Sequence, residues 1–135
     1  MADIYKAAGI IITDRKLLVV RAKDMAFFID PGGKIEAGET PEQALVRELK
    51  EEISIAVDPA DLTFFGEYTA EAANHPGKQV HMRAYIVTKW QGDIVPDSEI
   101  AEMRWLTHDI PADIQVGSIF GGKVLPALHA QGLVD

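Results

Sequence analysis

The chain has no cysteine, no long hydrophobic run and no excess of positive charge. Without cysteine a disulfide scaffold is impossible, and a reducing compartment is permitted. No run approaches the roughly 18 apolar residues of a membrane span, so we expect no contact with a membrane. The formal net charge is −8, and no basic stripe is visible, which argues against a nucleic-acid polymer as partner. An anionic small molecule remains possible, because a bound metal ion can supply positive charge.

The size and composition are those of an ordinary globular protein. The chain has 135 residues, of which 47% are hydrophobic and 25% charged, and we expect one domain over residues 1–135. The opening stretch MADIYKAAGIIITDRK carries Asp3 early and lacks a basic region, so it is not typical of a signal peptide. We expect a cytoplasmic protein that is a monomer or a homodimer.

Short apolar runs separated by turn residues predict strands. A closing helix is expected over 122–133, although Pro126 would start or kink it. Strands that precede and interrupt helices without regular alternation favour an α/β fold of the α+β type, with a mixed β-sheet between helices. The expected strands are 5–12, 16–22, 25–30, 62–71, 79–90 and 103–107.

The strongest helix signal covers residues 41–54 and follows a glycine-rich loop. Thr40 is a good N-cap, Pro41 suits the first helical position, and Gln43 completes a capping box with Thr40. Leu45, Leu49 and Ile53 then recur at helical spacing. These signals predict a helix whose apolar stripe faces the core.

Three glutamates, Glu48, Glu51 and Glu52, lie together beside this apolar stripe. Like charges at such spacing repel each other, so stability alone does not explain them. They could form a solvated acidic face, with Arg47 and Lys50 as counter-charges. They could equally bind a divalent cation such as Mg²⁺, which prefers carboxylate and water oxygens. Glycines in the preceding loop would let the backbone approach such a ligand; they are Gly32, Gly33 and Gly38.

The spacing from Gly33 to Ile55 resembles the signature of the Nudix hydrolases. Eight of its nine defined positions agree over 23 residues, and Ser54 stands where the family has glycine. The segment PGGKIE.GETPEQA.VREL.EE is especially similar in sequence to the corresponding segment of the MutT-like nucleoside triphosphate pyrophosphohydrolases of this family. The resemblance implies a Nudix-like α/β/α sandwich. It also implies hydrolysis of a nucleoside diphosphate linked to another group, with Mg²⁺ or Mn²⁺ as cofactor and a nucleotide as substrate. A (deoxy)nucleoside triphosphate, cleaved to monophosphate and pyrophosphate, is the best match.

The resemblance also assigns roles within the signature. Glu51 and Glu52 would bind the metal, with Glu48 and the carbonyl of Gly33 as further ligands. Glu52 would also help to deprotonate the attacking water. Two residues would act indirectly: Arg47 would orient Glu51 or Glu52, and Glu39 would brace the loop or reach the metal through water.

Residues outside the signature could complete the site. Glu99 is similar in position to a functional glutamate of MutT-like enzymes, and Glu102 competes for that role; either could be an ordinary surface acid. Asp30 could accept a hydrogen bond from a nucleobase or could be a solvated loop acid. The other expected substrate-binding residues are Arg21, Lys23, Phe28, Gly32, Gly33 and Lys34.

Two rival functions are weaker. Relatives that hydrolyse ADP-ribose, nucleotide sugars or dinucleoside polyphosphates tend to carry a proline or tyrosine past the signature, and the window 70–73 contains neither. Non-catalytic Nudix-like domains usually lose signature carboxylates, whereas all four glutamates are present here.

Overall fold

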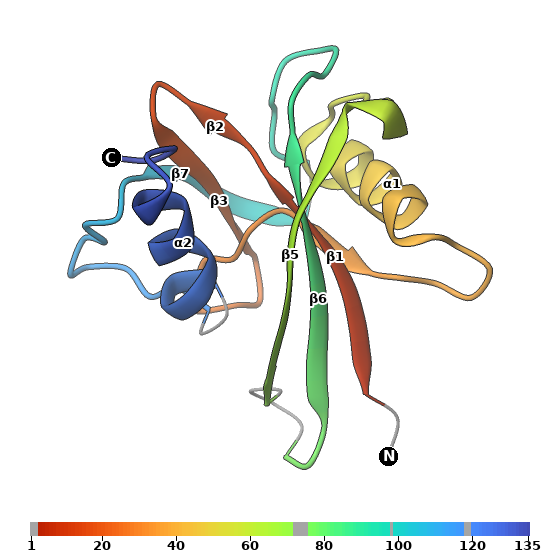
Figure 1. Ribbon diagram of the computed structural model, residues 1–135, viewed down its shortest axis with the longest axis horizontal. Coiled ribbons are helices and arrows are strands. Elements are labelled where there is room, and N and C mark those ends of the chain that lie inside the picture. The colour runs from red at the N-terminus through yellow and green to blue at the C-terminus, as the bar shows by residue number, and fades with distance from the viewer. Residues whose placement is uncertain (1–2, 72–75, 98, 118–119) are drawn as a thin grey trace.

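The computed structural model describes residues 3–71, 76–97, 99–117 and 120–135. Its strands form two sheets, one with the order β4-β1-β6-β5 and the other with the order β2-β3-β7 (Figure 1). The first sheet contains β1 (Ile4–Ile10), β4 (Gly32–Lys34), β5 (Leu62–Glu71) and β6 (Gln79–Val87). The second contains β2 (Ile12–Thr13), β3 (Lys16–Ala22) and β7 (Ile100–Leu106).

The first sheet is mixed. β1 runs parallel to β6, from the pair Ile4–Val80 to the pair Ile10–Ile86, and antiparallel to β4. The second sheet is antiparallel, and β2 turns into β3 through Asp14 and Arg15, both with positive φ. Positive φ at both central residues is the geometry of a tight type I′ hairpin turn.

Helix α1 spans Pro41–Ile53 and begins as the sequence predicts. The Gln43 N–H donates to the Thr40 hydroxyl, and the Thr40 N–H donates to the Gln43 side chain, which completes the capping box. A short 3₁₀ turn, η1 (Pro59–Asp61), follows before β5.

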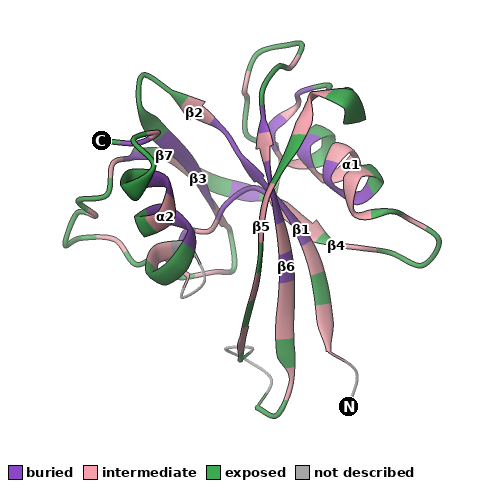
Figure 2. Cartoon of the chain, in the orientation of Figure 1, coloured by how far each residue is buried: buried purple, intermediate pink, exposed green. Residues whose placement is uncertain are grey.

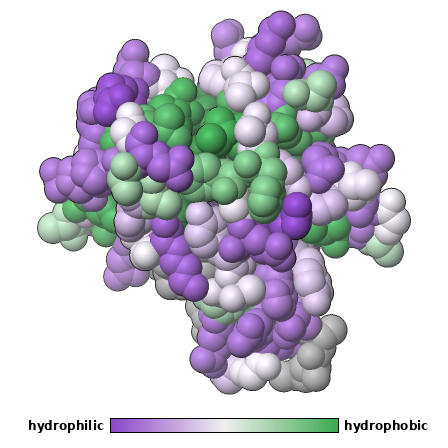
Figure 3. Space-filling model, viewed as in Figure 1, coloured by the Kyte–Doolittle hydropathy of each residue, from purple (hydrophilic) through white to green (hydrophobic). Residues whose placement is uncertain are grey.

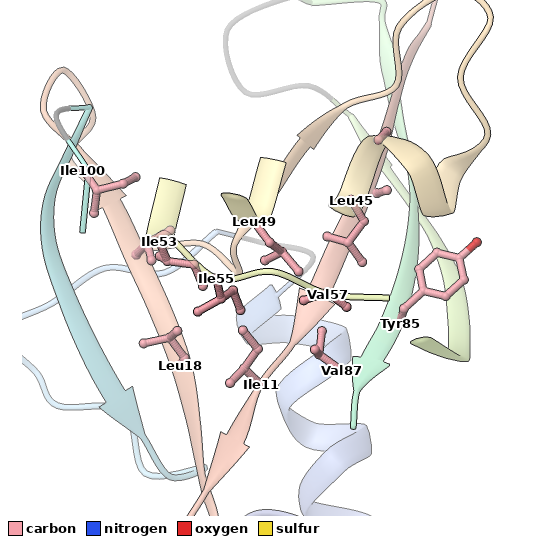
Figure 4. Close-up of a cluster of buried hydrophobic side chains, with 13 residues drawn as sticks. Ile11, Leu18, Leu45, Leu49, Ile53, Ile55, Val57, Tyr85, Val87 and Ile100 are labelled. Atoms are coloured by element: carbon pink, nitrogen blue, oxygen red, sulfur yellow. The ribbon is translucent and has the colours of Figure 1, made fainter. Parts of the chain in front are cut away.

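The two helices cover opposite faces of the first sheet, which makes an α/β/α sandwich (Figures 1 and 2). On the α1 side, Leu45, Leu49 and Ile53 pack with Ile11 and residues of β6 (Figure 4). On the other side, α2 (Leu125–Ala130) packs against alternate residues of the same strands. Members of that second cluster are Ala8, Ile10, Ala84, Leu125 and Leu128. Because side chains alternate along a strand, β1 serves both cores.

The expected fold class is confirmed, and several details differ from expectation. The strands divide into two sheets rather than one. Residues 25–30 form only isolated bridges, at Phe28 and Ile29, whereas Gly32–Lys34 is a strand instead of a loop. The strand expected over 79–90 stops at Val87, and the one expected from 103 begins at Ile100. At Gly32 and Gly33, the lack of a side chain lets this segment pair with β1.

The closing helix is shorter than expected. A π-helical turn, η2 (Phe120–Val124), precedes α2, and Pro126 lies in the first turn of α2. This position suits proline, because the first-turn N–H groups have no intrahelical partner.

The outer surface is unevenly polar. The projecting ends of β1, β5 and β6 are exposed or half-buried and mainly hydrophilic (Figures 2 and 3). Among the described residues, no helix is long and apolar enough to cross a membrane.

Candidate active site

Gly32 and Gly33 lie so close to neighbouring atoms that a side chain at either position would clash. A Cβ on Gly32 would lie 2.2 Å from the Ala7 carbonyl oxygen, and Gly32 has a φ of +145°. A Cβ on Gly33 would lie 2.5 Å from the carboxyl carbon of Glu48. Both separations are shorter than real Cβ contacts: at Gly32 the clash is with fixed backbone, whereas at Gly33 the Glu48 carboxylate would have to move. The two glycines therefore let β4 lie against β1 while the Glu48 carboxylate approaches the same loop.

Arg47 binds the loop to the helix. Its guanidinium makes a two-pronged contact with Glu39, at 2.8 and 3.0 Å, and donates to the Lys34 carbonyl at 3.1 Å. It also donates to Glu48 at 2.8 Å, whereas Glu51 is 3.5 Å away. Forked contacts of this kind are strong and directional. Arg47 thus orients Glu39 and Glu48 more closely than Glu51, and the structure gives it no contact with Glu52.

Glu39 braces the loop directly. One of its carboxylate oxygens accepts from the Glu36 N–H at 2.9 Å. The hydrogen bonds from Arg47, followed by that backbone bond, lower the pKa of Glu39 to about 2. Glu39 therefore stays ionised across the physiological range and anchors the turn that leads into α1.

Glu52 lies beneath the glycine loop. Its Oε1 accepts from the Gly32 N–H at 2.8 Å. Burial raises its pKa to about 8, and the charges of Glu48 and Asp30 add to this, despite the Gly32 bond and the charge of Lys6. A carboxylate with a pKa near neutrality is well matched to accept a proton from water. Oε1 is held by the backbone, so Oε2 is the atom left for that proton.

The remaining acids differ in exposure. The Glu48 side chain is 18% exposed, and burial raises its pKa. The Glu51 side chain is 58% exposed and lies at the rim. Among the described residues, no three acidic or histidine side chains form a ready-made metal centre.

The chemistry of the donors nevertheless fits a hard divalent cation. Glu48, Glu51 and Glu52 offer carboxylate oxygens beside a glycine loop whose missing Cβ at Gly33 leaves room for the Glu48 carboxylate. Burial raises the pKa of Glu48 and Glu52, and the negative charges of neighbouring acids add to the rise in each case. A bound cation would offset this repulsion.

Asp30 is the one buried charged residue in the described part of the chain, at 6% exposure. Its Oδ2 has no hydrogen-bond partner there. Burial raises its pKa to about 7, although its own backbone N–H and the charge of Lys6 oppose that rise. The sequence allowed Asp30 to be either a base-binding acid or a solvated loop acid. Because Asp30 is buried, the second interpretation is wrong.

The end of α1 carries the loop that leads to Glu99. Ser54 has φ 68° and ψ 20°, the left-handed conformation that the family's glycine adopts freely. Its hydroxyl donates to the Val95 carbonyl at 3.0 Å. The Val95 and Asp97 N–H groups donate to the carbonyls of Ile53 and Glu52. The helix end thus holds the loop 95–97 in place.

Glu99 and Glu102 lie in different surroundings. Glu102 is engaged by Arg104 at 3.1 Å and by Arg21 at 3.6 Å. Glu99 is exposed, and its carbonyl accepts from the Lys23 N–H. Glu99 is therefore the acid with a carboxylate available to a ligand, whereas Glu102 is neutralised by arginines.

Other expected substrate-binding residues are spread around the site. Lys23 and Lys34 are exposed, whereas Phe28 is buried in the core on the α2 side. A pocket of about 280 Å³ brings Arg21 and Phe28 together but does not include the signature glutamates. Its lining is Arg21, Ala26, Phe28, Glu102, Arg104, Asp113, Ile114 and Gln115.

Lys6 was missed by the sequence reasoning. Lys6 lies on β1, and its charge lowers the pKa of both Asp30 and Glu52. The available signal was a lysine inside the otherwise apolar run YKAAGIII.

Comparisons with known proteins agree with this geometry. The family model described as NUDIX domain matches residues 4–127. The chain is 39% identical over 98 residues to an 8-oxo-dGTP diphosphatase of Escherichia coli, covering 69% of this chain and 72% of that protein. It is 34% identical over 99 residues to a CTP pyrophosphohydrolase of the same species, covering 70% and 69%. The chain also superposes on a solved structure from a study of MutT of Aliivibrio salmonicida and Vibrio cholerae. The TM-score is 0.75 at 27% identity, and the match covers 97% of this chain and 99% of that one.

Proposed function

Because the chain belongs to the Nudix family and is a Nudix pyrophosphohydrolase, we propose that its substrate is a nucleoside triphosphate, cleaved to the monophosphate and pyrophosphate. The similarity to relatives named for 8-oxo-dGTP and CTP supports a triphosphate. Those two names differ in the base, so the base recognised by this chain is a separate question.

The single observation that carries the proposal is the placement of Glu52. Its Oε1 is fixed by the Gly32 N–H. Burial raises the pKa of Glu52 to about 8 in the metal-free protein, and a bound cation would lower that pKa, so that Glu52 is ionised and able to accept a proton. In the reaction, a water oxygen forms a bond to one phosphorus of the α–β anhydride, the bond from that phosphorus to the bridging oxygen breaks, and the monophosphate and pyrophosphate separate. The proton of that water passes to Glu52 Oε2. The fixed carboxylate meets the main demand of phosphoryl transfer, which is positioning.

Mg²⁺ or Mn²⁺ would be held by Glu48, Glu51, Glu52 and the Gly33 carbonyl. Such an ion neutralises phosphate charge and lowers the pKa of a bound water. Arg47 acts indirectly, because its contacts with Glu39 and Glu48 fix the loop against the helix. Glu99, on the neighbouring loop, would assist as a further acid.

Phosphate binding would use the cations and backbone at the rim. Lys23 and Lys34 are both exposed, and Lys34 directly follows the glycine pair that adjoins the glutamates. Arg21 is held by Glu102 and by the Met25 carbonyl, so binding a phosphate would require it to exchange partners.

The test is a panel of nucleotides with Mg²⁺, scored by release of pyrophosphate against release of phosphate, with ADP-ribose as a comparison. We expect triphosphates to be cleaved to monophosphate and pyrophosphate. In Glu52→Gln, which keeps the volume, kcat should fall by roughly 10²–10⁴-fold. Glu71→Gln, an exposed change at the end of β5, is the matched control. Turnover of Glu52→Gln near that of the wild type would remove Glu52 from this role.

A further inference from the structure

The Asp30 carboxyl is the feature that neither the fold nor the proposed chemistry explains. A buried polar atom without a partner costs stability, and such atoms are rare in native proteins. Asp30 Oδ2 is such an atom in the described part of the chain. The nearby charges do not resolve it: Lys6 attracts the carboxylate without a hydrogen bond, and Glu52 repels it.

The backbone around Asp30 is fixed on both sides. Ile29 exchanges two hydrogen bonds with Val20, at 2.8 and 2.9 Å. The Pro31 carbonyl accepts from the Gly9 N–H at 2.8 Å. These bonds prevent the segment from moving out to solvent, so the carboxyl is held as a pre-positioned acceptor. Preorganisation of this kind is what a binding site requires.

The segment connects the acidic centre with the turn η2. Two residues beyond Asp30, the Gly32 N–H holds Glu52. Two residues before it, Phe28 bonds to Gln115 and Gly117, and the Gly121 N–H donates to the Gly117 carbonyl inside the approach to η2. π-helical turns are frequently found at functional sites. If phosphates lie at the glutamates, the nucleoside extends along this segment.

Apolar and aromatic side chains are available on the face of the sheet that carries Lys6. Phe28, Met82 and Tyr68 belong to one apolar cluster. Lys6 pairs with Met82, which in turn pairs with Tyr68, so these three side chains share a face of the sheet. Apolar and aromatic walls with one placed polar atom are the usual composition of a small-molecule site.

We propose that Asp30 Oδ2 accepts a hydrogen bond from the exocyclic amino group of the substrate's nucleobase and thereby sets base specificity. This inference rests on the proposed function, because it names the part of the triphosphate that Asp30 recognises. A site built around such a bond rejects an analogue that lacks the donor, since the buried acceptor is then left unpaired.

The test compares bases that differ only in the amino group. The pairs are dGTP with dITP, dATP with the triphosphate of purine deoxyriboside, and dCTP with the triphosphate of its 4-desamino analogue. In the wild type, we expect kcat/KM to fall by about 10–100-fold within at least one pair, the size of a hydrogen bond to a charged group. In Asp30→Asn, which replaces one carboxyl oxygen by a donor, that ratio should shrink to within about threefold.

Asp14→Asn is the matched control, because Asp14 is an exposed turn residue with a φ of 53°, a conformation that asparagine tolerates. It removes the same charge and should keep the wild-type ratio. Asp30→Leu is the second variant, in case asparagine leaves an unpaired amide. Asp30→Leu should not lower Tm, because it removes an unpartnered buried carboxyl and leaves no polar atom unpaired.

Binding of the matching monophosphates in EDTA, measured by calorimetry, gives a second readout that needs no turnover. Equal wild-type kcat/KM and Kd within all three pairs would overturn the role of Asp30. So would a ratio that persists in both Asp30 variants. If no triphosphate were hydrolysed yet monophosphate Kd values still depended on the amino group and on Asp30, the proposed reaction would fail while the recognition stood.

Discussion

Ser54 offers a quantitative test of how the helix end supports the site. Three effects oppose each other when Ser54 is replaced by the family's glycine. Relief of the left-handed strain gains roughly 1–2 kcal/mol. Loss of the hydroxyl bond to the Val95 carbonyl costs about 0.5–1.5 kcal/mol. The added freedom of the unfolded chain costs about 0.4–1 kcal/mol.

These terms nearly cancel, so Ser54→Gly should change the free energy of unfolding by less than about 1 kcal/mol. Ser54→Ala loses the bond and keeps the strain, and should be about 1 kcal/mol less stable than the wild type. For a chain of this length that difference is about 3–5 °C in Tm. Because the loop 95–97 also has its own backbone bonds to α1, kcat of both variants should stay within a few-fold of the wild type.

Urea unfolding and Tm of the three proteins, measured together, test this reasoning. The expected order of stability is glycine similar to serine, with alanine lowest. An alanine variant as stable as the wild type would show that the Ser54–Val95 bond contributes nothing. A large loss of kcat in the glycine variant would show that the hydroxyl has a direct role in the reaction.

The other predictions concern the acids and their partners. A lysine at position 47 cannot make the forked contact with Glu39 and also reach the Lys34 carbonyl. We therefore expect Arg47→Lys to lower both Tm and kcat, with kcat lower by about tenfold or more. Unchanged values would mean that a positive charge alone suffices at this position. Glu99→Gln should lower kcat, whereas Glu102→Gln should mainly lower Tm, because it removes the ion pairs with Arg21 and Arg104. Steady-state kinetics and thermal melting of both variants test this. The reverse pattern would assign the catalytic role to Glu102 and the structural role to Glu99. In EDTA, Glu52 and Asp30 keep their protons in the folded state up to pKa values of about 8 and about 7, whereas the unfolded chain releases them near 4.5 and 3.8. The folded state therefore binds more protons over this window, and Tm should fall as pH rises from 5 to 8; a Tm that rises across that range would contradict the burial of these acids.

The sequence alone determined the local structure around the signature. Thr40, Pro41 and Gln43 specify where α1 begins, and the spacing of Leu45, Leu49 and Ile53 specifies which face is buried, because capping and periodicity act over a few neighbouring residues. The signature spacing likewise indicated the family. These features need no knowledge of distant parts of the chain.

Only the tertiary structure decided what the charged residues contact. Arg47 reaches Glu39 through a loop rather than Glu52 through the helix, since the fold brings the loop back onto α1. The division of the strands into two sheets depends on pairings between distant segments, such as β1 with β6. Asp30 looks like a loop acid in the sequence, yet hydrogen bonds from β1, β3 and the segment before η2 hold it inside. Its burial, on which the proposed role in base recognition depends, arises from long-range contacts that no local pattern encodes.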